Sequence, residues 1–189
     1  MAYGDLVTWE QVKAVLNLDD DRRELVEFLI SAASAQAEKF AGRFLAARDV
    51  SLKMDARGGR ELLLPSYPVN HTARVSVDPE RAFPGDNDLP VEQYGVKMSA
   101  GIIRLYRGEF PSGYDMVLFE GNIGYSPVPY DLQQAVIETV SANLRRFAVS
   151  GGGVGIKQLS INGTTTAQYE IDVPVSSRSV FISYRGARV

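Results

Sequence analysis

Residues 124–155 read GYSPVPYDLQQAVIETVSANLRRFAVSGGGVG, a helical pattern that runs directly into a glycine-rich segment. Pro129 suits the first helical position, where its missing N–H is not needed, and Asp131 suits the positive end of the helix dipole. Apolar side chains then repeat every four residues, at Leu132, Val136, Val140 and Leu144. The pattern predicts a long helix over residues 129–148, followed by a flexible glycine linker over residues 150–155.

The segment after this linker, residues 156–189, is predicted to form a β arm. Asn162-Gly163 is a strong signal for a two-residue hairpin turn, and the alternation in RSVFISYR, residues 178–185, predicts one further strand. Because an isolated hairpin is marginal in water, we expect the arm to dock on another molecule and to be dispensable for folding of the rest. The candidate docking residues are Leu159, Ile161, Tyr169 and Ile171 on an apolar face, with Arg178, Arg185 and Arg188 to steer the arm toward an acidic partner.

Two further helices are predicted near the N-terminus. Thr8-Trp9-Glu10-Gln11 is a capping box, in which a hydroxyl and a glutamine side chain each accept from a backbone N–H, and it opens a short helix over residues 8–17. Asp19-Asp20-Asp21 places carboxylates at the positive end of a long helix over residues 21–45. The helical period predicts a buried face made of Leu25, Phe28, Leu29, Ala32, Gln36, Phe40 and Phe44.

The middle of this long helix, residues 30–37, reads ISAASAQA and contains mostly small side chains. Small side chains let another backbone approach closely, either in the same chain or in a neighbouring subunit. The pattern predicts a subunit contact, with core packing as the alternative that it leaves open. The predicted contact residues are Ala32, Ala33, Ala35 and Gln36.

Residues 50–125 carry a strand pattern. Runs such as ELLLP, GIIRLY and DMVLFEG are short and aliphatic, and turn residues such as Gly, Pro and Asn separate them. They predict a small antiparallel β region inserted between the helices. The expected architecture is α+β: a helical bundle of one short and two long helices with this insertion forms a body over residues 1–149, and a C-terminal β-hairpin arm follows it.

The composition is that of a soluble globular protein. Of 189 residues, 45% are apolar and 23% charged, and the net charge of −3 gives no field that would gather nucleic acid. Cysteine is absent, which excludes disulfides, thiolate nucleophiles and cysteine metal ligands. No basic leader precedes an apolar run, and no apolar stretch nears the ~20 residues that span a bilayer, so we expect no membrane association.

Few residues point to catalysis or metal binding. The single histidine, His71, would need carboxylates as its partners at any metal site, and we expect it in a turn. Asp86-Asn87-Asp88 lacks the glycine and distal glutamate of a calcium loop, which favours a plain turn. No Gly-x-Ser-x-Gly elbow surrounds a serine. We expect no cofactor, no metal and no enzymatic activity; a small carboxylate-dependent hydrolase is the alternative from another class.

Three stretches together resemble the head–tail connector, or adaptor, family of tailed double-stranded DNA bacteriophages. Residues 7–45 read VTWEQVKAVLNLDDDRRELVEFLISAASAQAEKFAGRFL, similar to that family's short capped helix, acidic turn and long helix closing near an aromatic-glycine-arginine run. Residues 128–144, VPYDLQQAVIETVSANL, resemble the family's last helix, and residues 62–69, LLLPSYPV, resemble a segment between the helices. Short members have only a loop there, so the sheet over residues 50–125 indicates a long variant.

The resemblance implies a structural protein of a phage or prophage that forms a homo-oligomeric ring, dodecameric in the virion, below the portal vertex. Such a ring extends the DNA channel and joins capsid to tail, with the portal protein on one side and a stopper or tail-completion protein on the other. It also implies a place in the virion neck, after assembly in the host cytoplasm. DNA would pass without specific binding, in keeping with a surplus of five acids over bases before residue 129. Another phage neck or tail-completion protein is the nearest alternative function.

Overall fold

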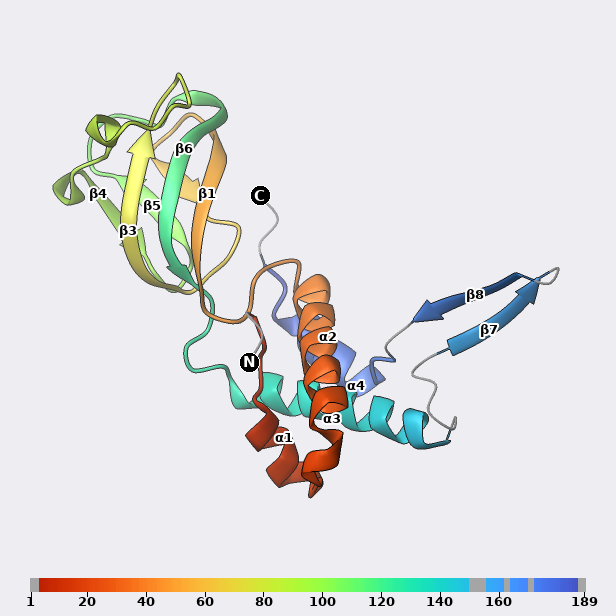
Figure 1. The fold of residues 1–189 in the computed structure, drawn as a ribbon. Coiled ribbons are helices and arrows are strands. Elements are labelled where there is room, and N and C mark those ends of the chain that lie inside the picture. The colour runs from red at the N-terminus through yellow and green to blue at the C-terminus, as the bar shows by residue number, and fades with distance from the viewer. Residues whose placement is uncertain (1–3, 150–155, 162–163, 170–171, 187–189) are drawn as a thin grey trace. The chain divides into compact units, whose positions relative to one another are not determined.

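The computed structural model describes residues 4–149, 156–161, 164–169 and 172–186 (Figure 1). Helices and small antiparallel sheets alternate along the chain, which confirms the predicted α+β class. The chain divides into two compact units. We call Met1–Gly42 with Val128–Arg185 the helical unit, and Arg43–Pro127 with Gly186–Val189 the β unit. In the described residues, no helix is both long and apolar enough to cross a membrane.

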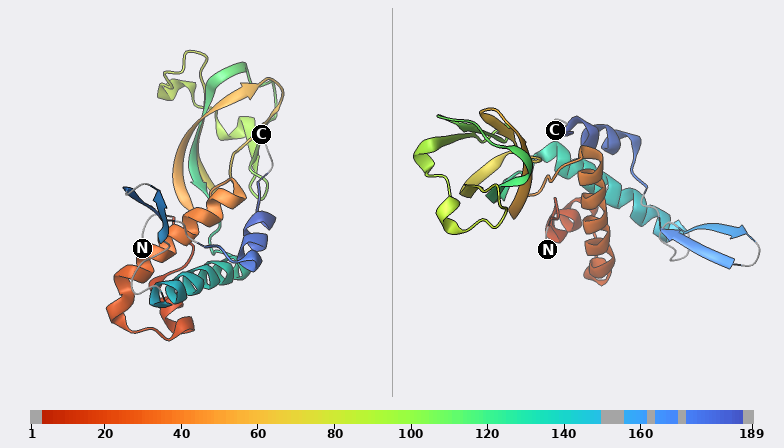
Figure 2. Two further views of the ribbon diagram at one scale, coloured as in Figure 1. Left: turned by 90° about the vertical axis from the view of Figure 1, so that its right-hand side faces the viewer. Right: turned by 90° about the horizontal axis from the view of Figure 1, so that it is seen from above.

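The helical unit is built on α2 and α3, which cross each other (Figure 2). Its helices are α1 (Trp9–Leu16), the 3-10 turn η1 (Asp20–Arg22), α2 (Arg23–Ala41), α3 (Tyr130–Val149) and α4 (Val175–Ser183). The capping box that opens α1 is present: the Gln11 backbone N–H donates to the Thr8 hydroxyl, and the Thr8 N–H donates to the Gln11 side chain at 2.7 Å. Helix α2 ends at Gly42, which adopts a left-handed conformation with φ of 66° that favours glycine.

The buried face of α2 differs from the predicted one. The buried residues are Val26, Leu29, Ile30, Ala33, Ser34, Ala37 and Ala41, so the inward face is rotated away from Leu25 and Phe28. Helix α2 contacts both α3 and α4, and its alanines permit the close approach of these two neighbours. The small residues therefore serve packing within the subunit on one side of α2, and the bulky Phe28 side chain is left in solvent.

The final segment is a helix, so the prediction of a strand over residues 178–185 is wrong. Helix α4 packs on α2 and α3, and the Phe181 side chain is fully buried and lies over the Phe40 ring, with centroids 6.4 Å apart. The Asn143 side chain ties the approach to α4 to α3, since it donates to the Asp172 carbonyl and accepts from the Asp172 N–H. Tertiary burial of one aromatic has overridden the strand propensity of the local sequence.

The predicted hairpin is confirmed in its backbone pairing. Strand β7 (Ile156–Ile161) pairs antiparallel with β8 (Thr164–Tyr169), and the register brings Ile161 opposite Thr164. This register fits the two-residue turn that Asn162-Gly163 predicts. The glycine linker over residues 150–155 lies outside the described residues.

The β unit contains two three-stranded antiparallel sheets, which confirms the predicted β insertion. One has the order β1-β6-β3 and the other the order β2-β5-β4. The strands are β1 (Arg48–Arg57), β2 (Glu61–Leu63), β3 (Val69–Val77), β4 (Tyr94–Lys97), β5 (Ile102–Leu105) and β6 (Ser112–Ile123). The inward side chains of both sheets form one apolar core around Phe119 and Ile103. His71 lies within β3, so its prediction as a turn residue is wrong.

A buried carboxylate organises the loop that follows β3, where η2 (Gly85–Asn87) and η3 (Val91–Gln93) lie. Asp78 accepts from the backbone N–H groups of Glu80, Ala82 and Phe83 at 2.7 to 2.9 Å. These hydrogen bonds, that from Phe83 first among them, lower the pKa of Asp78. They also hold Phe83 at a positive φ of 51°, which a residue with a bulky side chain seldom adopts. The turn predicted at Asp86-Asn87-Asp88 is present as η2, and Asp88 pairs with Arg74.

Candidate functional site

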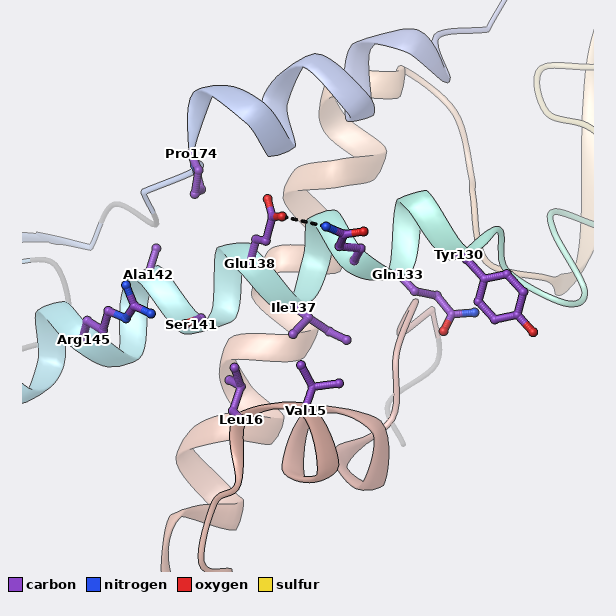
Figure 3. Close-up of a pocket in the computed structure, with 11 residues that line it drawn as sticks. Val15, Leu16, Tyr130, Gln133, Ile137, Glu138, Ser141, Ala142, Arg145 and Pro174 are labelled. Carbon is purple, nitrogen blue, oxygen red and sulfur yellow. Dashed lines mark hydrogen bonds between the residues drawn. The ribbon is translucent and has the colours of Figure 1, made fainter.

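An apolar groove runs along α3 in the helical unit, between α1 on one side and Pro174 on the other (Figure 3). We call it the α1–α3 groove; its volume is about 630 Å³. The lining residues are Val15, Leu16, Tyr130, Gln133, Gln134, Ile137, Glu138, Ser141, Ala142, Arg145 and Pro174. Val15 is 64% exposed and Tyr130 is 88% exposed, so the groove presents large apolar groups to solvent.

The groove follows from how α1 is attached to the rest of the unit. Helix α1 buries Trp9 and Val12, and the Gln11 side chain donates to Gln133 of α3 at 2.9 Å. This attachment holds α1 near α3, while Val15 and Leu16 at its C-terminal end are left as one wall of the groove. The apolar surface that Val15 and Leu16 form at this end of α1 faces open space.

The charged groups in the groove differ in how they are engaged. Both carboxylate oxygens of Glu138 accept hydrogen bonds within the subunit: from Gln134 at 3.1 Å, and from the Ser176 and Ser177 hydroxyls at 3.3 and 3.2 Å. Arg145 is exposed at the opposite end of the groove from Tyr130 (Figure 3), and no described residue forms an ion pair with it. The described part of the groove thus ends in a positive charge without a partner.

The outward face of α2 is a second candidate surface. Phe28 is 60% exposed, and Glu24, one helical turn before it, is exposed as well. Of the predicted subunit-contact residues, Ala33 is buried inside the subunit, Ala32 and Gln36 are half-buried, and only Ala35 is fully exposed. The structure thus brings Ala32 and Ala35 to the same outward face as Phe28 and directs Ala33 toward the core.

The predicted docking-arm residues separate into two groups. Arg178 lies in α4 with its guanidinium 5.2 Å from the Phe40 ring centroid, and Arg185 is exposed just after α4, so both belong to the helical unit. Leu159, Ile161 and Tyr169 lie on the paired strands β7 and β8. Ile171 and Arg188 lie outside the described residues.

The described residues hold no group of three or more histidine and acidic side chains that could bind a metal ion. The lowered pKa values belong to Asp78 and Asp88, and each has a local cause in the β unit: backbone hydrogen bonds for Asp78, and Ser76 and Arg74 for Asp88. Tyr94 has a raised pKa because it is buried. These shifts mark well-bonded turns and a core tyrosine in the β unit.

Sequence reasoning missed the groove and the exposure of Phe28. A periodic pattern identifies an apolar face but gives no information on which neighbour covers it. One signal in the sequence could have predicted that Phe28 is exposed. The opposite face of α2 has the same helical period and smaller side chains, which a close helix crossing requires; its residues are Val26, Ile30, Ala33 and Ala37.

The sequence matches no protein-family model and no curated protein. Three solved structures with a similar fold are chains of gene transfer agent (GTA) particles. A chain from the neck of an empty GTA particle, computed with C6 symmetry, has a TM-score of 0.61 and 19% identity over 97% of this chain and 91% of that one. A chain from the neck of a native GTA particle, computed with C12 symmetry, has a TM-score of 0.60 and 19% identity over 100% and 94%. A chain of a native GTA virion has a TM-score of 0.57 and 18% identity over 88% and 79%.

These likenesses extend over nearly the whole chain, both units included. They confirm, at the level of the fold, the resemblance to a head–tail neck protein that the sequence predicts.

Proposed function

We propose that this chain is a structural, non-enzymatic subunit of a head–tail connector, which forms a ring in the neck of a tailed phage, prophage or phage-like particle. The observation that carries the proposal is the likeness in fold, over nearly the full length, to chains from the neck of a GTA particle. Those necks were computed with C6 and C12 symmetry, and we expect a dodecameric ring for this chain. The ring would extend the DNA channel and join capsid to tail.

The surfaces of the helical unit support such a ring. A cyclic ring larger than a dimer needs two different, mutually complementary surfaces on each subunit, because every contact is heterologous. The helical unit offers an apolar groove between α1 and α3 and a separate exposed aromatic on α2. An apolar groove and an aromatic side chain that are both exposed to solvent are typical of a protein that binds a partner.

The partners in this proposal are the portal protein on one side of the ring and a stopper or tail-completion protein on the other. We assign the docking role to the β7–β8 hairpin, since α4 packs on α2 and α3 and is therefore already engaged within the subunit. DNA would pass through the channel without specific binding, since dense phosphate contacts would hold it back.

The ring is tested by the mass of the purified chain, measured by light scattering from low to high micromolar concentration and by electron microscopy of particles that carry it. We expect rings of cyclic symmetry, either free or in the neck of the particle. A chain that stays monomeric and is absent from purified particles would contradict the proposal. Turnover of a hydrolase substrate would instead favour the enzyme alternative.

The docking role of the hairpin is tested by replacing residues 153–170 with a short Gly-Ser linker, which retains Asp172 and α4. We expect a nearly unchanged melting temperature, because the core of the helical unit is intact, together with loss of attachment to portal-bearing capsids. A matched control is Val91→Ser, which removes an exposed apolar side chain from the β unit. Attachment that survives the hairpin replacement would show that the portal contact lies elsewhere.

A further inference from the structure

The α1–α3 groove is suited to receive an apolar side chain from outside the subunit. Its centre is formed by Val15, Leu16 and Ile137, which come from two helices and face a common open space (Figure 3). An exposed apolar hollow with a polar rim is typical of a protein interaction site. Its volume of about 630 Å³ is large enough for an aromatic side chain with its neighbouring helix surface.

The outward face of α2 has the complementary shape. Phe28 projects from it, and the small side chains of Ala32 and Ala35 lie one and two turns further along the same face. An aromatic ring flanked by alanines can enter a groove deeply, because the backbone around it approaches the groove walls without obstruction. Aromatic side chains of this kind supply much of the binding energy of protein interfaces.

The charges on the two surfaces are also complementary. Glu24 in the first turn of α2 and Asp21 in η1, just before α2, are exposed, and no described residue forms an ion pair with either of them. Arg145 is the exposed cation at the end of the groove. A carboxylate set against this guanidinium would steer the approach of the two surfaces and fix their register.

We propose that the α1–α3 groove of one subunit receives the outward face of α2 from an adjacent copy of this chain, with Phe28 in the apolar centre and Glu24 against Arg145. Along α3, Ile137 and Arg145 are about 12 Å apart, and along α2, Glu24 and Phe28 are about 6 Å apart. The long arginine and glutamate side chains span the difference. The contact is heterologous and repeats around a ring, so this inference rests on the proposed function and specifies its subunit contact.

Cysteine cross-linking tests the contact directly, since the chain has no native cysteine. A double variant, Phe28→Cys with Ile137→Cys, treated with a short bis-maleimide, is expected to give a ladder of dimers, trimers and higher species on a denaturing gel. Each single variant is the matched control: a heterologous contact brings residue 28 of one copy to residue 137 of the next, so one cysteine alone gives no ladder. A double variant that cross-links no further than the single variants overturns the inference.

Charge exchange tests the register of the contact. Arg145→Glu and Glu24→Arg are each expected to weaken self-association about tenfold by placing like charges together, and the double variant is expected to restore it. Phe28→Ala, which removes the apolar anchor, is expected to weaken association at least about 30-fold. All of these side chains are exposed, so circular dichroism and the melting temperature of the dilute, dissociated chain should stay as in the wild-type chain.

The outcomes distinguish this inference from the ring itself. If the wild-type chain forms rings and neither the charge exchange nor Phe28→Ala alters them, the subunit contact lies elsewhere and the ring proposal stands. If single charge variants weaken association and the double variant does not restore it, the pairing of Glu24 with Arg145 is wrong. If the wild-type chain never associates, in solution or in particles, both proposals fail together.

Discussion

The two compact units of this chain are assembled from the sequence in different ways. The β unit is one continuous stretch of chain apart from its C-terminal end, and its two sheets enclose a single apolar core. The helical unit joins two distant stretches and is closed by polar contacts such as those between Asn143 and Asp172. It leaves a groove and Phe28 in solvent. Both units expose single large apolar side chains, such as Val91 and Tyr114 in the β unit, so the proposed subunit contact rests on the groove together with Phe28 and not on exposure alone.

The largest expected effect tests whether α4 belongs to the core of the helical unit. Phe181→Ala removes a fully buried ring that lies over Phe40, and we expect the free energy of unfolding to fall by about 3–5 kcal/mol. Denaturant unfolding monitored by circular dichroism measures this change. Val175→Ala, in the first turn of α4 and exposed, is the control and should change little. If Phe181→Ala leaves the free energy of unfolding nearly unchanged, α4 is not part of the core and would belong to the docking arm that the sequence predicts.

A smaller loss of stability is expected when the hydrogen bonds between Asn143 and Asp172 in the same unit are removed. The buried Asn143 side chain donates to the Thr139 and Asp172 carbonyls and accepts from the Asp172 N–H. Asn143→Ala leaves the Asp172 carbonyl and N–H without this partner, and we expect a loss of about 1–3 kcal/mol in the free energy of unfolding. Gln134→Ala, at an exposed position on the same helix, is the control. If the two variants lose equal stability, the segment before α4 is not held by Asn143.

In the β unit, the buried Asp78 carboxylate holds the loop after β3, and its contribution to stability depends on pH. The pKa of Asp78 is lowered, chiefly by the hydrogen bond from the Phe83 N–H, so its contribution to stability is complete above the unfolded-state pKa of about 3.9. The contribution is lost as the pH falls through the lower pKa of the folded state. We expect acid to destabilise the β unit in this range, and Asp78→Asn to remove part of that pH dependence. An unchanged acid profile in Asp78→Asn would assign the acid sensitivity to other carboxylates.

The features that could be predicted from the sequence have partners close along the chain. The capping box of Thr8 and Gln11 spans three residues, and the strands β7 and β8, whose pairing the Asn162-Gly163 dipeptide predicts, are adjacent in sequence. Such signals are complete within a short window, so one sequence is enough to read them.

The features that could not be predicted depend on distant neighbours. Val180, Ile182 and Tyr184 alternate as in a strand, yet the segment is helical because Phe181 finds a place against α2. Ser177 and Phe181 are both fully buried and four residues apart, a helical spacing that the strand-like alternation obscured. The groove and the exposure of Phe28 also depend on residues that are distant in sequence, because the packing of the helices decides which apolar faces are covered.

The smallest expected effect is also the most informative about the helical unit. Phe28 and Leu29 are neighbours on α2, and Leu29 is almost fully buried while Phe28 is 60% exposed. In the dilute, dissociated chain, Phe28→Ala should change the free energy of unfolding by no more than about 0.5 kcal/mol, because its ring has little contact to lose. Leu29→Ala, the matched control, should cost about 2–5 kcal/mol. Denaturant titrations at several protein concentrations separate folding from association: the two variants should reverse their rank when self-association is measured at high concentration in folded protein. If Phe28→Ala is as destabilising as Leu29→Ala in the dilute chain, the ring of Phe28 is part of the subunit's own core and has no place in a neighbour's groove.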